Sequence, residues 1–159
     1  MPQKVVGISE IYVSDDANDE LVTYSLGSCI CVTVYDPIAK VAGMIHYMLP
    51  LSKVSPEKAK KTPAMFADTG VTELLRLVFD LGAVKDRLIV KAAGGSSLMD
   101  QKKIFNIGER NYLILRKILW KNNILIKSED VGGSISRTVH FNVDTGKVTV
   151  KTSKGIQEL

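Results

Sequence analysis

Cys29 and His46 are the residues of this chain whose types and spacing best suit nucleophilic catalysis. Cys29 closes the segment TYSLGSC (23–29), and His46 lies in the segment GMIHYMLP (43–50). A free thiol has a pKa of about 8.5 and is mostly protonated at neutral pH, so it needs a base to become a good nucleophile. A neighbouring imidazole can accept that proton. The pair therefore predicts a thiol nucleophile with a histidine general base.

The same two residues also allow a purely structural interpretation, in which a buried cysteine packs beside a hydrogen-bonded core histidine. Ser25 and Ser28 are further candidate nucleophiles. A thiolate forms more easily than an alkoxide, which favours Cys29 over both serines. Gly27 permits close approach of the backbone just before the sulfur, where N–H groups could stabilise an oxyanion.

Two apolar segments must bring the thiol and the imidazole together. Residues 30–35 (ICVTVY) have the β-branched and aromatic composition of a strand, and residues 41–48 form a second apolar run. Between them, residues 36–40 (DPIAK) contain an Asp and a Pro, which favour a turn. Two strands joined by so short a loop predict an antiparallel hairpin.

The register of this hairpin decides how close the two side chains lie. A symmetrical loop predicts that Tyr35 lies opposite Val41 and that Ile30 lies opposite His46. Cys29 is then within one residue of the position that faces His46. Opposed side chains in such a pair have Cβ atoms roughly 4.5–5.5 Å apart, but a slip of one residue turns a side chain to the other face. The pattern thus predicts proximity without fixing the geometry.

The rest of the chain alternates helical and strand patterns. Apolar residues at helical spacing precede Gly82, and residues 106–122 predict a second helix that begins with a capping box of Asn106 and Glu109. The apolar residues expected to face the core are Val71, Leu74, Leu75, Val78 and Leu81 in the first helix and Ile114, Leu115, Ile118 and Leu119 in the second. Further strands are expected at 88–93, 124–126, 138–143 and 147–150. The polar segment 52–61 is expected to be an exposed loop over the site.

These elements predict an α/β fold, a layered α/β sandwich with mixed or antiparallel strands and two main helices. The 159 residues, 45% of them hydrophobic and 24% charged, suit one domain spanning 1–159. No apolar run reaches the roughly 20 residues that span a bilayer, and no long apolar signal segment opens the chain, so we expect a cytoplasmic protein without membrane insertion. The net charge of +4 comes from scattered Lys and Arg residues, which predicts no nucleic-acid partner.

The two cysteines do not suggest a disulfide framework or a metal site. Cys29 and Cys31 are too close in sequence to bridge easily, and Cys31 is interpreted as a packing residue. A zinc site would need Cys29, Cys31, His46 and His140 to converge, without a Cys-x-x-Cys or His-x-x-x-His pair. We therefore expect no metal and no organic cofactor.

Three further features lie in the second half of the chain. Asp130 and Arg137 flank a glycine pair and predict a structural ion pair. Gly94 and Gly95 follow a strand, and their most common role would be a simple turn, with support of another backbone or a substrate as the alternative. Phe105 belongs either to the core or to a protein contact.

Several motifs in order along the chain resemble one family. They are Thr-x-x-Leu-Gly-Ser-Cys from Thr23, Asp36-Pro37, Gly-x-x-His-x-x-Leu-Pro from Gly43, AGGS (93–96), NIGERN (106–111), DVGG (130–133) and Ser136-Arg137. Together they cover most of the chain and resemble the chemoreceptor glutamine deamidases of the CheD family. This is much more specific than an isolated Cys and His.

The resemblance implies a function and a set of roles. In that family a cysteine attacks the side-chain amide of receptor glutamines, a histidine acts as base and a threonine orients the histidine; the matching residues are Cys29, His46 and Thr23. It also implies a fold similar to that of the cytotoxic necrotizing factor deamidases, and two partners, the chemoreceptor cytoplasmic helices and the chemotaxis phosphatase CheC.

Two other functions remain open from the sequence. The chain could act mainly as a non-catalytic regulatory binding partner of CheC, although the matching Thr23, Cys29 and His46 argue for catalysis. It could also be a cysteine peptidase or a transglutaminase-like enzyme, which would incorporate an added amine instead of releasing ammonia.

Overall fold

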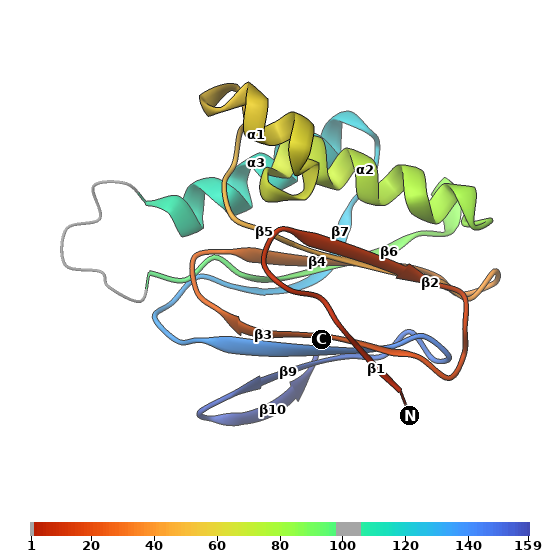
Figure 1. Ribbon diagram of the computed structural model, residues 1–159. Helices are drawn as coiled ribbons and strands as arrows, with labels where there is room; N and C mark the ends of the chain where they lie inside the picture. The colour runs from red at the N-terminus through yellow and green to blue at the C-terminus, as the bar shows by residue number, and fades with distance from the viewer. Residues whose placement is uncertain (1, 98–105) are drawn as a thin grey trace.

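The computed structural model of the chain describes residues 2–97 and 106–159. Among these residues, ten strands form two five-stranded sheets that lie face to face, and the longer helices cover the outer face of one sheet (Figure 1). The predicted α/β sandwich with mixed strands and two main helices is confirmed. Phe105 lies outside the described residues.

The first sheet lies beneath the helices. Its strands, in spatial order, are β2 (Glu10–Ser14), β5 (Val41–Tyr47), β4 (Ile30–Asp36), β6 (Ile89–Gly94) and β7 (Ile126–Val131). The covering helices are α1 (Pro56–Lys61), α2 (Ala67–Asp80) and α3 (Ile107–Lys121), with 3₁₀ turns η1 (Ser52–Val54), η2 (Pro63–Met65) and η3 (Lys85–Arg87). The β6 and β7 strands are parallel, whereas the other pairs in this sheet are antiparallel.

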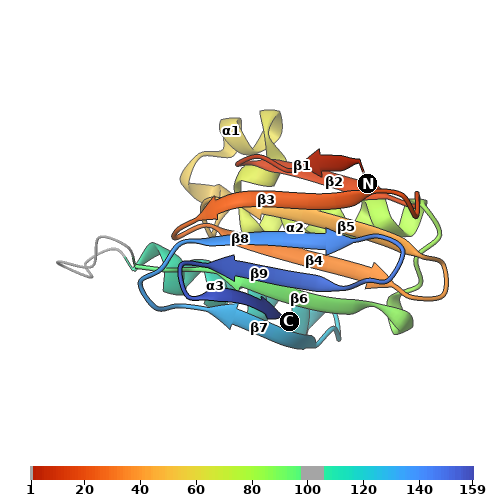
Figure 2. The same cartoon turned by 90° about the horizontal axis from the view of Figure 1, so that it is seen from below.

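The second sheet forms the opposite face of the molecule, as Figure 2 shows from below. Its spatial order is β1 (Gln3–Val5), β3 (Glu20–Leu26), β8 (Arg137–Asn142), β9 (Val148–Thr152) and β10 (Gly155–Glu158). The predicted last hairpin is confirmed as β8 and β9, which pair antiparallel. The β1 and β3 strands are parallel.

The first sheet is therefore covered on both of its faces. One hydrophobic core lies between this sheet and the helices, and a second lies between the two sheets. Every residue of β4 and β5 is buried as a result. This explains why their sequences are nearly continuous apolar runs and do not alternate between apolar and polar residues.

The hairpin of β4 and β5 differs by one residue from the prediction. Asp36 pairs with Val41 as the last strand residue, so the loop contains four residues, 37–40. Cys31, and not Ile30, consequently lies opposite His46. The error arose because Asp36 was assigned to the turn, although its side chain supports the turn from within the strand by accepting the N–H groups of the loop residues Ile38 and Ala39.

Two other local predictions were wrong. Segment 52–61 is mostly helical, because its Pro56 occupies the first turn of α1, where proline is well tolerated. It is also held down, since Ser52 donates its N–H and its hydroxyl to Asp68 of α2. Asn106 does not cap α3 with its side chain; its backbone is left-handed (φ 42°), whereas a capping box requires an extended residue at that position.

The predicted helices and strands otherwise lie near their expected positions. In α2 the residues Val71, Leu74, Leu75 and Val78 are buried, but Leu81 is 39% exposed. In α3 the residues Leu115 and Leu119 are buried, with Ile114 and Ile118 packed at the edge of the core. The strand expected at 124–126 begins only at Ile126.

Candidate active site

His46 and Thr23 meet between the two sheets. His46 lies on β5 and Thr23 on β3 of the facing sheet, and both side chains are buried. The Thr23 Oγ1 lies 2.7 Å from His46 Nδ1 and 2.6 Å from the carbonyl oxygen of Val6. A carbonyl can only accept, so the hydroxyl donates its proton to Val6 and accepts from His46. Nδ1 of His46 therefore carries the proton.

This tautomer leaves the lone pair of His46 on Nε2. Among the described residues no group forms a hydrogen bond with Nε2, although it is buried. Burial lowers the pKa of His46 to about 4, because the cationic imidazolium is poorly solvated between the sheets. At neutral pH His46 is thus an uncharged imidazole with one free basic nitrogen, the state that a general base requires.

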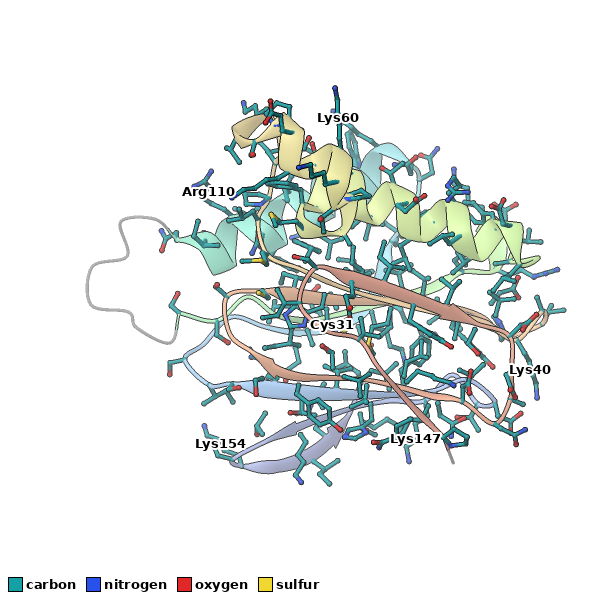
Figure 3. The ribbon with its side chains drawn as sticks, viewed as in Figure 1. Cys31, Lys40, Lys60, Arg110, Lys147 and Lys154 are labelled. Atoms are coloured by element: carbon teal, nitrogen blue, oxygen red, sulfur yellow. The ribbon has the colours of Figure 1, made fainter. Side chains whose placement is uncertain are left out.

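Cys29 lies at the same end of the first sheet. Gly27, Ser28 and Cys29 form the bend between β3 and β4, and Cys29 is partly exposed. It precedes by two residues Cys31, which pairs with His46, and it packs against the core between the sheets that contains Cys31. Figure 3 shows Cys31 between the sheets. The structure therefore brings the predicted nucleophile, base and orienting threonine to one region.

The thiol of Cys29 is uncharged at rest. Burial raises its pKa, and a hydrogen bond from its own backbone N–H opposes this only in part. Neither Ser28 nor Cys29 donates its N–H to a backbone acceptor within the described part of the chain. The N–H of Ser28 is therefore available to stabilise negative charge that develops beside the sulfur, and that of Cys29 already points at the sulfur itself.

The glycine pair after β6 supports the backbone of the nucleophile bend. The N–H of Gly95 donates to the carbonyl of Cys29 at 2.9 Å, and the N–H of Ser96 donates to that of Gly27 at 2.9 Å. Gly94 has a φ of +114°, and a Cβ there would collide with the carbonyl oxygen of Cys29. Support of a neighbouring backbone, the less common alternative for this pair, is the one that the structure shows.

Arg137 holds this glycine segment in place. Its buried guanidinium donates to the hydroxyl of Ser96 at 2.7 Å and to the carbonyl of Gly94 at 3.2 Å. It also forms the predicted ion pair with Asp130, at 3.2 Å. Arg137 thus contacts, from the second sheet, the same residues that bind the nucleophile bend.

Asn111 is a residue of the site that the sequence analysis missed. It is fully buried on α3, and its Nδ2 donates to the carbonyl of Ser28 at 2.9 Å and to that of Met48 at 2.8 Å. The available signal was its position on the apolar face of the helix, four and eight residues before Leu115 and Leu119. An amide on such a face usually has specific partners.

The remaining candidates have other surroundings, although Cys31 lies opposite His46 on the neighbouring strand. Cys31 is buried in the core between the sheets, as its interpretation as a packing residue predicted, and burial raises its pKa. His140 is half-buried, 3.2 Å from Glu20. Within residues 2–97 and 106–159, no three His, Cys, Asp or Glu side chains gather closely enough to hold a metal ion. In the same residues no helix is long and apolar enough to cross a bilayer.

Comparison with known proteins gives one consistent result. A family model described as CheD chemotactic sensory transduction matches residues 48–152. A probable chemoreceptor glutamine deamidase CheD 1 from Syntrophus aciditrophicus is 51% identical over 155 residues, which cover 98% of this chain and 97% of that protein. The chemoreceptor glutamine deamidase CheD from Thermotoga maritima is 40% identical over 157 residues, covering 99% and 96% of the two chains. The chain therefore belongs to the CheD family.

Proposed function

We propose that the protein hydrolyses the side-chain amide of selected glutamines in chemoreceptors, giving glutamate and ammonia, with Cys29, His46 and Thr23 as its catalytic residues. The observation that carries the proposal is the His46 imidazole, held by Thr23 in the tautomer that leaves Nε2 basic. The names of the curated relatives, chemoreceptor glutamine deamidase, supply the substrate.

In the first step Nε2 of His46 accepts the proton of the Cys29 thiol as the sulfur attacks the amide carbon. A C–S bond forms, and the carbonyl oxygen becomes an oxyanion beside the N–H group of Ser28. Thr23 accepts a hydrogen bond from Nδ1 throughout this step, which stabilises the imidazolium that forms.

The second step releases ammonia. The oxyanion collapses, the C–N bond breaks, and His46 returns its proton to the departing nitrogen, leaving a thioester between Cys29 and the former glutamine. Water then attacks the thioester carbon while Nε2 accepts a proton from it. Cleavage of the C–S bond yields glutamate, and His46 protonates the leaving sulfur, which restores both groups.

The resting site contains no ion pair. The raised pKa of Cys29 and the lowered pKa of His46 both favour the uncharged forms, so proton transfer accompanies the attack on the substrate. The reaction uses groups of the protein and one water molecule.

Intact mass of a receptor cytoplasmic fragment tests this function. Amide-to-acid exchange adds about one mass unit per glutamine, and we expect this gain with the wild-type protein and none with Cys29→Ala, which removes the nucleophile. Cys31→Ala is the matched control, because that buried thiol lies opposite His46 but takes no part in the proposed reaction, and its variant should retain deamidation. No mass gain with wild-type protein and several receptors would contradict the proposal.

We also propose, on the family resemblance, that the whole chain of residues 1–159 acts as one domain in the cytoplasm and binds the phosphatase CheC. A regulatory role without catalysis is the alternative function. Cys29→Ala separates the two, since a purely regulatory protein would keep its effect on CheC and on signalling, whereas the effect of an enzyme on receptors would be lost.

A further inference from the structure

We propose that Asn111 is a positioning residue that holds the loop of the nucleophile and the strand of the base in a fixed relation. This inference rests on the proposed roles of Cys29 and His46. Ser28, whose carbonyl accepts one N–H of the Asn111 amide, directly precedes Cys29. Met48, whose carbonyl accepts from the same nitrogen, comes two residues after His46. One side chain therefore joins the two segments that carry the reacting groups.

The two carbonyls have no other backbone support. Among the described residues, no backbone N–H donates to the carbonyl of Ser28 or of Met48, because both lie just outside the hydrogen-bonded strands. Both residues are partly buried, and Asn111 provides a donor to each carbonyl, at 2.9 and 2.8 Å. Beyond the last strand pair, Ile30 with Tyr47, the amide is the contact that joins the two segments at this end of the sheet.

The helix that carries Asn111 is itself firmly placed against the site. The hydroxyl of Tyr47, the residue after His46, donates to the backbone carbonyl of Asn111 at 2.6 Å. Gly108 of the same helix packs so closely on Gly95 that a Cβ would collide with the Gly95 carbonyl oxygen. Gly95 in turn donates its N–H to the carbonyl of Cys29. The helix α3 therefore contacts both the strand that carries His46 and the segment that supports Cys29.

A merely structural role explains this residue poorly. Asn111 is fully buried on the helix face that Leu115 and Leu119 share, where a leucine would bring no polar atom into the core. Its Oδ1 is buried and has no partner among the described residues, which is unfavourable for folding. The site therefore retains an amide despite its cost in stability, and the benefit is the alignment of the thiol with Nε2.

The test compares Asn111→Leu, which removes both donors but keeps the branching at Cγ, with Asn111→Ser, which keeps one donor. Leu119→Ala is the matched control, since it destabilises the same helix face two turns away from Asn111. Each variant is assayed well below its melting temperature for kcat and KM on a receptor fragment. The rate of Cys29 alkylation by iodoacetamide is followed by mass at the Cys29 peptide, which measures the thiol independently of any receptor.

We expect Asn111→Leu to lower kcat about 100-fold with KM changed less than about threefold, because misalignment affects proton transfer more than binding. Asn111→Ser should fall between it and the wild type. The alkylation rate should fall about tenfold in Asn111→Leu. His46→Asn alone should also slow alkylation. Added to Asn111→Leu, however, it should slow alkylation little further, because in that variant the thiol no longer reaches its base. Leu119→Ala should lower only the melting temperature.

Two results would overturn the inference. One is an Asn111→Leu protein with wild-type kcat and alkylation rate despite a lowered melting temperature, which is the behaviour of a structural residue. The other is an additive effect of His46→Asn on alkylation in both backgrounds. If Asn111→Leu does not fold, Asn111→Ser decides by the same criteria. Slower alkylation of Asn111→Leu than of the wild type, together with no deamidation of any receptor by the wild type, would contradict the proposed function and support the positioning role.

Discussion

Thr23 determines what His46 can do, because its single hydroxyl proton is already committed to Val6. Thr23→Val keeps the shape but leaves Nδ1 of His46 without an acceptor, so the tautomer is no longer fixed. We expect kcat for deamidation to fall about 10- to 100-fold, which is less than the loss of a whole general base because His46 itself remains. Thr23→Ser retains the hydroxyl and should keep most activity. Equal activity of the valine and serine variants, measured by receptor mass, would show that the hydroxyl has no such role.

For single residues, the sequence best predicted those side chains whose chemistry few residue types share. Cys29 and His46 could be named because few side chains serve as nucleophile and base near neutral pH. Thr23 was found through family resemblance alone, since a threonine in a strand has nothing local to distinguish it. Asn111 was not found, because the importance of its amide depends on two carbonyls that lie more than sixty residues away along the chain.

Among the elements, the end of β6 is the one most directly tied to the nucleophile. Gly94→Ala would place a Cβ against the carbonyl oxygen of Cys29 and would also strain a backbone with φ +114°. We expect deamidation to fall more than about tenfold, because the bend must move. Gly82→Ala is a matched control, since Gly82 has φ +107° and open space around it. If both variants lost stability alike and kept activity, the contact with Cys29 would be irrelevant to catalysis.

The predicted elements were most accurate where burial imposes a strong pattern. The helix α2 and the hairpin of β8 and β9 were recognised from apolar periodicity. Among the described residues, four strands were missed. The strands β1, β2 and β10 are edge strands with few buried residues, whereas β3 is a largely buried inner strand. The register of β4 and β5 was wrong by one residue, since it depends on whether Asp36 belongs to the loop, and its side-chain hydrogen bonds support the turn in either case.

For the whole molecule, enclosing His46 between two sheets should make stability depend on pH. Its pKa is about 4 in the folded protein and about 6.5 in the unfolded chain, so the unfolded chain binds more protons between these values. The free energy of unfolding should therefore decrease as the pH falls from about 6.5 to 4, by on the order of 2–3 kcal/mol. Denaturant titrations of wild-type protein across this range measure it.

His46→Asn is the control for this prediction, because the amide can replace the Nδ1 donor to Thr23 but does not titrate. Its unfolding free energy should change less over the same range. Asp36 acts in a different window: burial alone would raise its pKa, but hydrogen bonds from Arg87 and from backbone N–H groups lower it overall. Its contribution is lost only below about pH 4. If the free energy of unfolding fell equally between pH 6.5 and 4 in the wild type and in His46→Asn, His46 would be excluded as the cause.

The uncharged resting state of Cys29 has a consequence for oxidation. Peroxides react with thiolates and hardly at all with thiols, so cysteines that sense oxidants have low pKa values. Burial raises the pKa of Cys29, and the imidazole nearby is uncharged and cannot stabilise a thiolate as a cation would. In the resting enzyme the sulfur should therefore be converted to sulfenic acid more slowly than the low-pKa cysteine of an oxidant sensor.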